Sequence, residues 1–196
     1  MLDAEEKIKQ ILYSEIENIG KEKIQAKINS SIESSQKYID KIMSECITKL
    51  TYESNDDNDD ENDNYNIIIA TLCEMLLHFM LTICTLPSER KIQVKNDLIL
   101  DVIIPNLQNL KTRPDKSIII QIIKDKIMDL NKTSQLEFLQ PNHENIWLIS
   151  AKPLSITKYT TYTVYPNARL HNYSNIIIDI DNFLKETEDK SFRFIH

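Results

Sequence analysis

The sequence predicts an α/β protein in which a mixed sheet of about five strands is flanked by helices and preceded by a helical N-terminal arm. Three observations support this fold class. Apolar residues recur at helical spacing through residues 3–51, a strongly acidic stretch follows, and short β-branched runs then alternate with helical segments. We therefore divide the chain into a helical arm (1–52), an acidic disordered linker (53–65) and a compact α/β domain (66–196).

The arm is predicted to contain consecutive amphipathic helices. Its isoleucines and leucines recur every three or four residues, first over residues 8–19, then over 24–32 and again over 39–50. Gly20 is expected to end the first helix, because glycine readily adopts the backbone conformation that follows a helix. Each apolar stripe is narrow. The arm is therefore interpreted either as a coiled coil or docking helices, including a homodimer through residues 3–51, or as helices that pack on their own domain.

The linker accounts for the charge of the whole chain. Residues 53–65 contain seven Asp and Glu residues and no Lys or Arg, and the formal net charge of the protein is −7. The remainder is therefore neutral overall, so the acidic average does not argue against DNA binding. An EF-hand loop starting at Asp57 would need glycine and glutamate where Asn62 and Ile68 stand, so a solvated linker is preferred.

The α/β domain is predicted to begin with a buried helix over residues 66–86. A hairpin follows, with strands at 91–95 and 98–104 around the turn Asn96-Asp97. Residues 117–123 form a β-branched run suited to a central strand. Further expected elements are a helix at 125–139, strands at 145–150 and 159–165, and a closing segment at 176–180 that leads into a helix at 181–188. Residues 191–195 could add a last strand.

Composition excludes several classes of protein. The chain has a single glycine, whereas phosphate-cradling loops need several, so Walker-type, Rossmann and kinase-type nucleotide sites are excluded. Its three cysteines have no paired spacing and are interpreted as reduced thiols of a cytoplasmic protein. No uninterrupted apolar run is long enough for a membrane span, and the charged first residues do not resemble a secretory signal.

A small set of polar residues stands out in the apolar elements of the domain. Glu74 lies on the buried helix, Asp101 is the one charge in the strand LILDVII, and Gln121 interrupts the strand IIIQII. Lys124 follows that last strand. A buried polar side chain needs hydrogen-bond partners, so Gln121 in particular indicates a structural or functional polar site.

The order of these elements over residues 66–150 resembles the core of PD-(D/E)XK, or restriction-endonuclease-like, nucleases. The resemblance implies that Glu74, Asp101 and Gln121 hold Mg²⁺, and that Asp101, Gln121 and Lys124 form the catalytic group of a DNA-cleaving enzyme. This sequence departs from the family pattern at two positions. Gln121 replaces the second acid, and Ile123 occupies the lysine position. Lys124 should point away from Gln121 unless the strand ends or bulges there, because side chains alternate along a strand.

Other candidate sites have structural alternatives. Cys73, His78 and Cys84 share one helical segment without a second ligand pair, which favours core packing. An aromatic and basic group could stack on bases and contact phosphates, or could form the polar face of an edge strand. It comprises Lys152, Lys158, Tyr159, Tyr162, Tyr165, Arg169, His171 and Tyr173.

Two functions follow from these patterns. The first is a restriction-endonuclease-like domain that binds or cleaves DNA, with Mg²⁺ at an intact or degenerate site. The second is a non-catalytic intracellular assembly module that uses the N-terminal helices. The sequence leaves open whether the chain is an enzyme.

Overall fold

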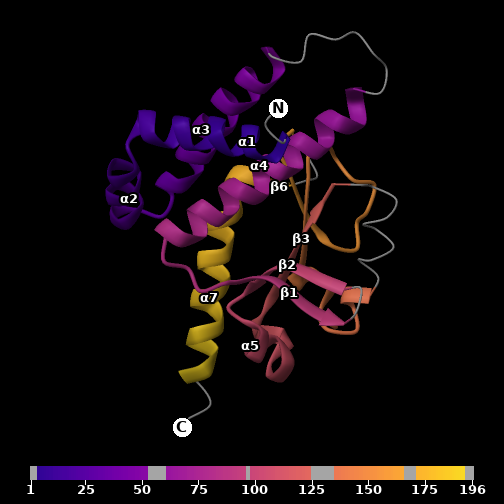
Figure 1. Ribbon diagram of the computed structural model, residues 1–196. Helices are drawn as coiled ribbons and strands as arrows, with labels where there is room; N and C mark the ends of the chain where they lie inside the picture. Colours follow the sequence, from indigo (N-terminus) through magenta and orange to yellow (C-terminus); the bar gives the residue numbers. More distant parts are fainter. Residues whose placement is uncertain (1–3, 53–60, 96–97, 125–134, 166–170, 193–196) are drawn as a thin grey trace.

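The computed structural model describes residues 4–52, 61–95, 98–124, 135–165 and 171–192 (Figure 1). Three helices, α1 (Ala4–Ile19), α2 (Lys21–Ser30) and α3 (Ser34–Tyr52), precede the long helix α4 (Glu61–Ile83). The strands are β1 (Glu89–Lys95), β2 (Leu98–Ile104), β3 (Ile118–Ile123), β4 (Ile146–Ser150), β5 (Thr160–Thr163) and β6 (His171–Asn172). Between and after them lie the short helices α5 (Leu107–Thr112), η1 (Pro114–Lys116), η2 (His143–Asn145) and η3 (Tyr173–Asn175), and the helix α7 (Ile176–Phe192).

The strands form one mixed sheet in the order β1-β2-β3-β4-β5-β6. The first three are antiparallel to their neighbours, whereas β3 to β6 run parallel. This confirms the predicted fold class. The sheet has six strands and not about five, because the two residues of β6 pair with Tyr162 and Thr163 at the edge.

Two helical layers and loops cover the sheet. Alternate residues of β3 belong to the hydrophobic clusters on opposite faces of the sheet. Ile118, Ile120 and Ile122 pack with α4 and the N-terminal helices. Ile119 and Ile123 pack on the other face. This double burial explains why β3 is almost entirely isoleucine. The face covered by α4 also receives α7, and the other face receives Leu110 of α5.

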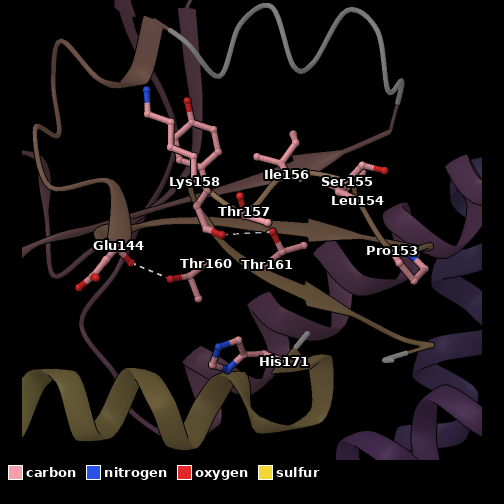
Figure 2. A pocket seen from close by; sticks show the side chains of 11 residues that line it. Glu144, Pro153, Leu154, Ser155, Ile156, Thr157, Lys158, Thr160, Thr161 and His171 are labelled. Atoms are coloured by element: carbon pink, nitrogen blue, oxygen red, sulfur yellow. Dashed lines mark hydrogen bonds between the residues drawn. The ribbon is translucent and has the colours of Figure 1, made fainter. Parts of the chain in front are cut away.

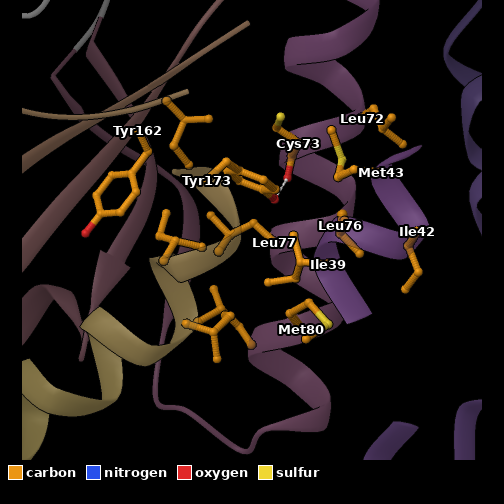
Figure 3. Packing of buried hydrophobic residues seen from close by; sticks show 14 of the residues in the cluster. Ile39, Ile42, Met43, Leu72, Cys73, Leu76, Leu77, Met80, Tyr162 and Tyr173 are labelled. Carbon is orange, nitrogen blue, oxygen red and sulfur yellow. Dashed lines mark hydrogen bonds between the residues drawn. The ribbon is translucent and has the colours of Figure 1, made fainter. Parts of the chain in front are cut away.

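The N-terminal arm packs on its own domain. Gly20, at φ 93°, ends α1 as predicted, and its N–H donates to the carbonyl of Ile16. Ile42 of α3 and Leu76 of α4 have no exposed surface and belong to one continuous core. Figure 3 shows α3 side chains facing α4 across this core. The apolar stripe is thus buried within the chain, in line with the interpretation that the arm packs on its own domain, and a coiled coil or a docking role stays a prediction.

Three boundaries differ from the sequence prediction. Helix α4 begins at Glu61, inside the predicted linker of residues 53–65, because helix propagation costs little once the buried turns have formed; residues 53–60 lie outside the described part of the chain. Residues 176–180 belong to α7 itself, which continues through Phe192 where a last strand was expected. Most of the predicted helix at 125–139 also lies outside the described residues.

Helix α4 is the most apolar helix of the described chain segments. By length and composition its stretch Asn64–Ile83 could cross a membrane. More than half of that window is buried inside the protein, as is typical of the core helix of a globular domain.

We expect Leu76→Ala to lower the free energy of unfolding by about 2–5 kcal/mol, because it leaves a cavity where α3 meets α4. Chemical denaturation followed by circular dichroism and by Trp147 fluorescence measures this loss. Ile67→Ala, on the same helix but 42% exposed, is the matched control and should cost far less. Two separate transitions, or equal losses for both variants, would contradict a single core shared by the arm and the domain.

Candidate metal centre

Asp101 lies at a point in strand β2 where the regular alternation of side chains between the two faces of the sheet is broken. Leu98 and Leu100 pack on one side of the sheet, whereas Val102 and Ile104 pack on the other, although all four would share a face in a regular strand. The register with β1 is the same on both sides of this point, with the pairs Arg90↔Val102 and Ile92↔Leu100, so the change of face does not come from a shift in pairing. The register shift between β1 and β2 lies further along, between Gln93 and Lys95.

Lys91 lies opposite this change and has a positive φ of 50°. Few residues other than glycine adopt this conformation, and such strain persists only where surrounding interactions hold it. Here the lysine side chain provides them. Its Nζ lies 2.7 Å from Oδ1 of Asp101 and 2.5 Å from Oε1 of Glu74.

The Asp101 carboxylate takes the place of a backbone acceptor in the sheet. Pairing between β2 and β3 ends at Val102↔Ile120. Beyond that point Oδ2 of Asp101 accepts the backbone N–H of Ile122 at 2.8 Å and the side-chain amide of Gln121 at 2.5 Å. Asp101 is 8% exposed, so these bonds and Lys91 replace its hydration.

Glu74 joins the centre from helix α4. Its second oxygen, Oε2, lies 2.8 Å from Nζ of Lys124. The polar groups therefore form a continuous series in which Lys124 contacts Glu74, Glu74 contacts Lys91, Lys91 contacts Asp101, and Asp101 contacts Gln121.

All four residues selected from the sequence thus belong to one cluster, and Lys91 was missed. Lys124 follows the end of β3 at Ile123 and reaches the cluster from the α4 side through Glu74. Since β3 ends at Ile123, Lys124 falls under the exception that the sequence analysis allowed to regular alternation. The positive φ of Lys91 left no recognisable mark in the sequence, since Lys91 alternates with apolar neighbours like any exposed strand residue.

Ion pairs and burial oppose each other at the carboxylates. Burial raises the pKa of Glu74, but hydrogen bonds from Lys124 and Lys91 outweigh it and hold that pKa below its usual value. At Asp101 burial prevails over the bonds from Lys91 and Ile122, so the pKa is raised. For Lys91, burial lowers the pKa, yet its bonds to Asp101 and Glu74 raise it overall and keep the ammonium charged.

A pH prediction follows for Glu74. Because its pKa is lower in the folded state, its stabilising contribution is present above the unfolded pKa of about 4.3 and is lost as pH falls through the folded value. The difference in unfolding free energy between wild type and Glu74→Gln should therefore be largest near neutral pH and shrink in acid. Denaturation at several pH values measures it, with Glu17→Gln on the exposed face of α1 as control. A pH-independent difference would contradict the ion-pair account.

The oxygen atoms of this cluster are of the chemical kind that binds divalent metal ions. Oε1 of Gln121 is buried and has no hydrogen-bond partner among the described residues, although its amide nitrogen is bonded to Asp101. A buried carbonyl oxygen without a partner is costly unless a ligand completes it. With the carboxylates of Glu74 and Asp101 it supplies the hard oxygen donors that Mg²⁺ prefers. Within the described part of the chain, no group of three or more His, Cys, Asp or Glu residues could hold a metal.

The cysteines do not form a second metal site. Cys46 and Cys73 are fully buried in the main core, as expected for packing residues. Burial is the main reason that the pKa values of Cys46 and Cys84 are raised to about 12, so neither thiol is activated as a ligand or nucleophile.

Some members of the aromatic and basic group lie in the hydrophobic core, and others line a pocket. Tyr162 and Tyr173 are each 1% exposed, and the hydroxyl of Tyr173 donates to the carbonyl of Cys73, so neither can stack on a base. Lys158, Tyr159 and His171 line a pocket of about 560 Å³ beside β5 (Figure 2). Lys158 and Tyr159 both bond Glu137 there. Arg169 lies outside the described residues.

Comparison with known proteins identifies the fold. No family model and no curated protein matches the sequence. The structure superimposes on metal-depleted Ecl18kI, a PD-(D/E)XK restriction endonuclease solved in complex with uncleaved, modified DNA, with a TM-score of 0.56. The match covers 95% of this chain and 80% of Ecl18kI at 9% identity. The protein therefore has a restriction-endonuclease-like fold, as the sequence resemblance implied.

Proposed function

We propose that this protein is a DNA-binding, divalent-metal-dependent phosphodiesterase whose metal is held by Glu74, Asp101 and Gln121. The observation that carries this proposal is the buried oxygen of Gln121, which lies beside two carboxylates and has no hydrogen-bond partner among the residues that the structure describes. A purely structural cluster would gain nothing from leaving that oxygen without a partner. The restriction-endonuclease-like fold supports the same reading.

When bound, Mg²⁺ would supply Lewis-acid stabilisation of the phosphate and a more acidic water. Glu74 and Asp101 would bind the ion through their carboxylates, and Gln121 through its amide carbonyl. The buried N–H of Ile122 and the amide of Gln121 hold the Asp101 carboxylate in place. This is the rigid orientation that a metal ligand needs.

The two lysines act as hydrogen-bond donors in this proposal. Lys91 keeps its proton because its pKa is raised, so it would stabilise negative charge on a phosphate oxygen and would not serve as a general base. The side chains of Lys91 and Lys124 are 48% and 37% exposed. Both can therefore turn from Glu74 towards a phosphate when a metal ion neutralises the carboxylates.

DNA is the proposed partner because Ecl18kI, the structural neighbour, was solved with DNA. Outside residues 53–65 the formal charges of the chain cancel, so no overall negative field opposes binding. Mg²⁺ as the ion and a cytoplasmic location remain parts of the proposal. The alternative assembly module has less support, since the apolar stripe that it requires is buried within the chain; a homodimer stays a prediction.

A cleavage assay tests this function. Purified protein is incubated with single-stranded, duplex and branched DNA in the presence of Mg²⁺ or Mn²⁺, and in parallel with a chelator. We expect metal-dependent cleavage of at least one substrate. A wild-type protein that is folded and cleaves none of them in either metal would overturn the proposed activity.

A further inference from the structure

A second pocket adjoins the candidate metal centre on the other side of Glu74. It has a volume of about 240 Å³ and lies between α1, α4 and β1. Lys9 and Tyr13 of α1 form one wall, His78 and Glu74 of α4 form another, and Arg90 of β1 lies opposite. We call this cavity the α1–α4 pocket. Because Glu74 lines both sites, a ligand in the pocket would lie next to a phosphate at the metal centre.

Arg90 is the unusual residue of this pocket. It is only partly exposed, yet its guanidinium makes no ion pair or hydrogen bond within the described part of the chain. The neighbouring Lys91, by contrast, contacts two carboxylates. A guanidinium has five N–H donors, and no nitrogen of Arg90 is buried without a partner, so its donors remain open to solvent and available to an anionic ligand.

The acids that line the pocket do not neutralise Arg90. Both oxygens of Glu74 are already engaged by Lys91 and Lys124. Glu5 is exposed and forms no ion pair with the guanidinium among the described residues. Arg90 also lies near His78. The pKa of the His78 imidazole is lowered, mainly by burial and in addition by the positive charge of Arg90. The pocket therefore combines the guanidinium of Arg90 with the imidazole of His78 and the ammonium of Lys9.

We propose that Arg90 binds a backbone phosphate of the DNA, next to the phosphate that reaches the metal centre. A guanidinium matches two phosphate oxygens at once, and contacts of this kind set the position of a protein on the nucleic acid. Lys9 of α1, which is half exposed and forms an ion pair with Glu6 at 3.4 Å, lies in the same lining and can turn its ammonium towards the phosphate. The packed N-terminal arm thereby gains a role in substrate binding. This inference rests on the proposed function only in taking DNA as the ligand.

The test measures binding to a short random-sequence duplex as a function of salt concentration, in a chelator so that no cleavage can occur. Wild type is compared with Arg90→Gln, Arg90→Lys and Arg113→Gln; Arg113 is an exposed arginine at the end of α5 and serves as the matched control. Arg90→Gln should weaken binding about tenfold. It should also reduce the slope of log K against log salt by about 0.9, the loss of one phosphate contact.

The remaining variants decide the interpretation. Arg113→Gln should leave the slope near that of wild type, and Arg90→Lys should restore the slope with weaker binding, because it keeps the charge but loses the fork. Equal slopes for Arg90→Gln and wild type, or no DNA binding by wild type, would overturn the inference. Arg90-dependent binding without cleavage in the separate activity assay would instead overturn only the proposed activity. Thermal unfolding of each variant confirms that the fold is intact.

Discussion

Replacing Asp101 with asparagine is expected to reduce metal-dependent DNA cleavage more than a hundredfold. The substitution removes the charge of a proposed metal ligand. Loss of a residue that only supports a ligand already costs ten- to a hundredfold in many metal sites, so loss of the ligand itself should cost more. The asparagine carbonyl can still accept the N–H of Ile122, which Asp101 accepts at 2.8 Å, so the sheet should remain paired. Cleavage rates at saturating Mg²⁺ measure the effect.

Asp101→Ala separates this catalytic loss from a structural one. Alanine leaves the N–H of Ile122 and the amide of Gln121 without their acceptor in a buried place, and it removes one partner of Lys91. We expect it to lower the free energy of unfolding by about 2–4 kcal/mol, clearly more than Asp101→Asn. Asp101→Asn that is folded and cleaves at the wild-type rate would contradict a metal role for this residue.

Gln121→Glu is expected to raise the affinity for Mg²⁺ at least tenfold and to increase cleavage at limiting Mg²⁺. The substitution places a charged oxygen where the buried carbonyl Oε1 has no partner in the described part of the chain. An additional negative charge about 4 Å from the ion is worth several kcal/mol even after strong dielectric screening. Rates measured over a range of Mg²⁺ concentrations report the change in affinity.

The same variant should be less stable without metal. The new carboxylate would lie beside Asp101, whose Oδ2 now accepts the Gln121 amide at 2.5 Å, and two adjacent carboxylates repel each other. Added Mg²⁺ should restore the melting temperature. Gln140→Glu is the control, because Gln140 is a buried glutamine whose amide nitrogen and carbonyl oxygen are both bonded. Equal metal responses of the two variants would contradict the assigned ligand.

Much of the sheet could be predicted because its signals are local. The hairpin, the isoleucine-rich central strand and the single charge in LILDVII each have a direct physical meaning in a short window of sequence. Asp101 and Gln121 stood out since a polar side chain in a buried strand needs a partner. In the structure each is the partner of the other.

The arrangement around Lys91 could not be predicted because it depends on contacts between distant segments. Regular alternation assigns every second residue of β2 to one face, and this rule fails between Leu100 and Val102. The change is coupled to the positive φ of Lys91, which is held by an aspartate ten residues away and a glutamate on α4. The apolar stripe of an amphipathic helix also does not show which other segment will pack on it. In this protein the N-terminal arm and α4 pack on each other.

Direct titration with Mn²⁺, followed by electron paramagnetic resonance in the absence of DNA, is the most direct measurement because it needs no knowledge of the substrate. Wild type is expected to bind Mn²⁺, the double variant Glu74→Gln/Asp101→Asn to lose this binding, and Gln121→Glu to bind Mn²⁺ more strongly. Wild type that binds no Mn²⁺, or binding that is unchanged in the double variant, would contradict a metal centre at Glu74, Asp101 and Gln121.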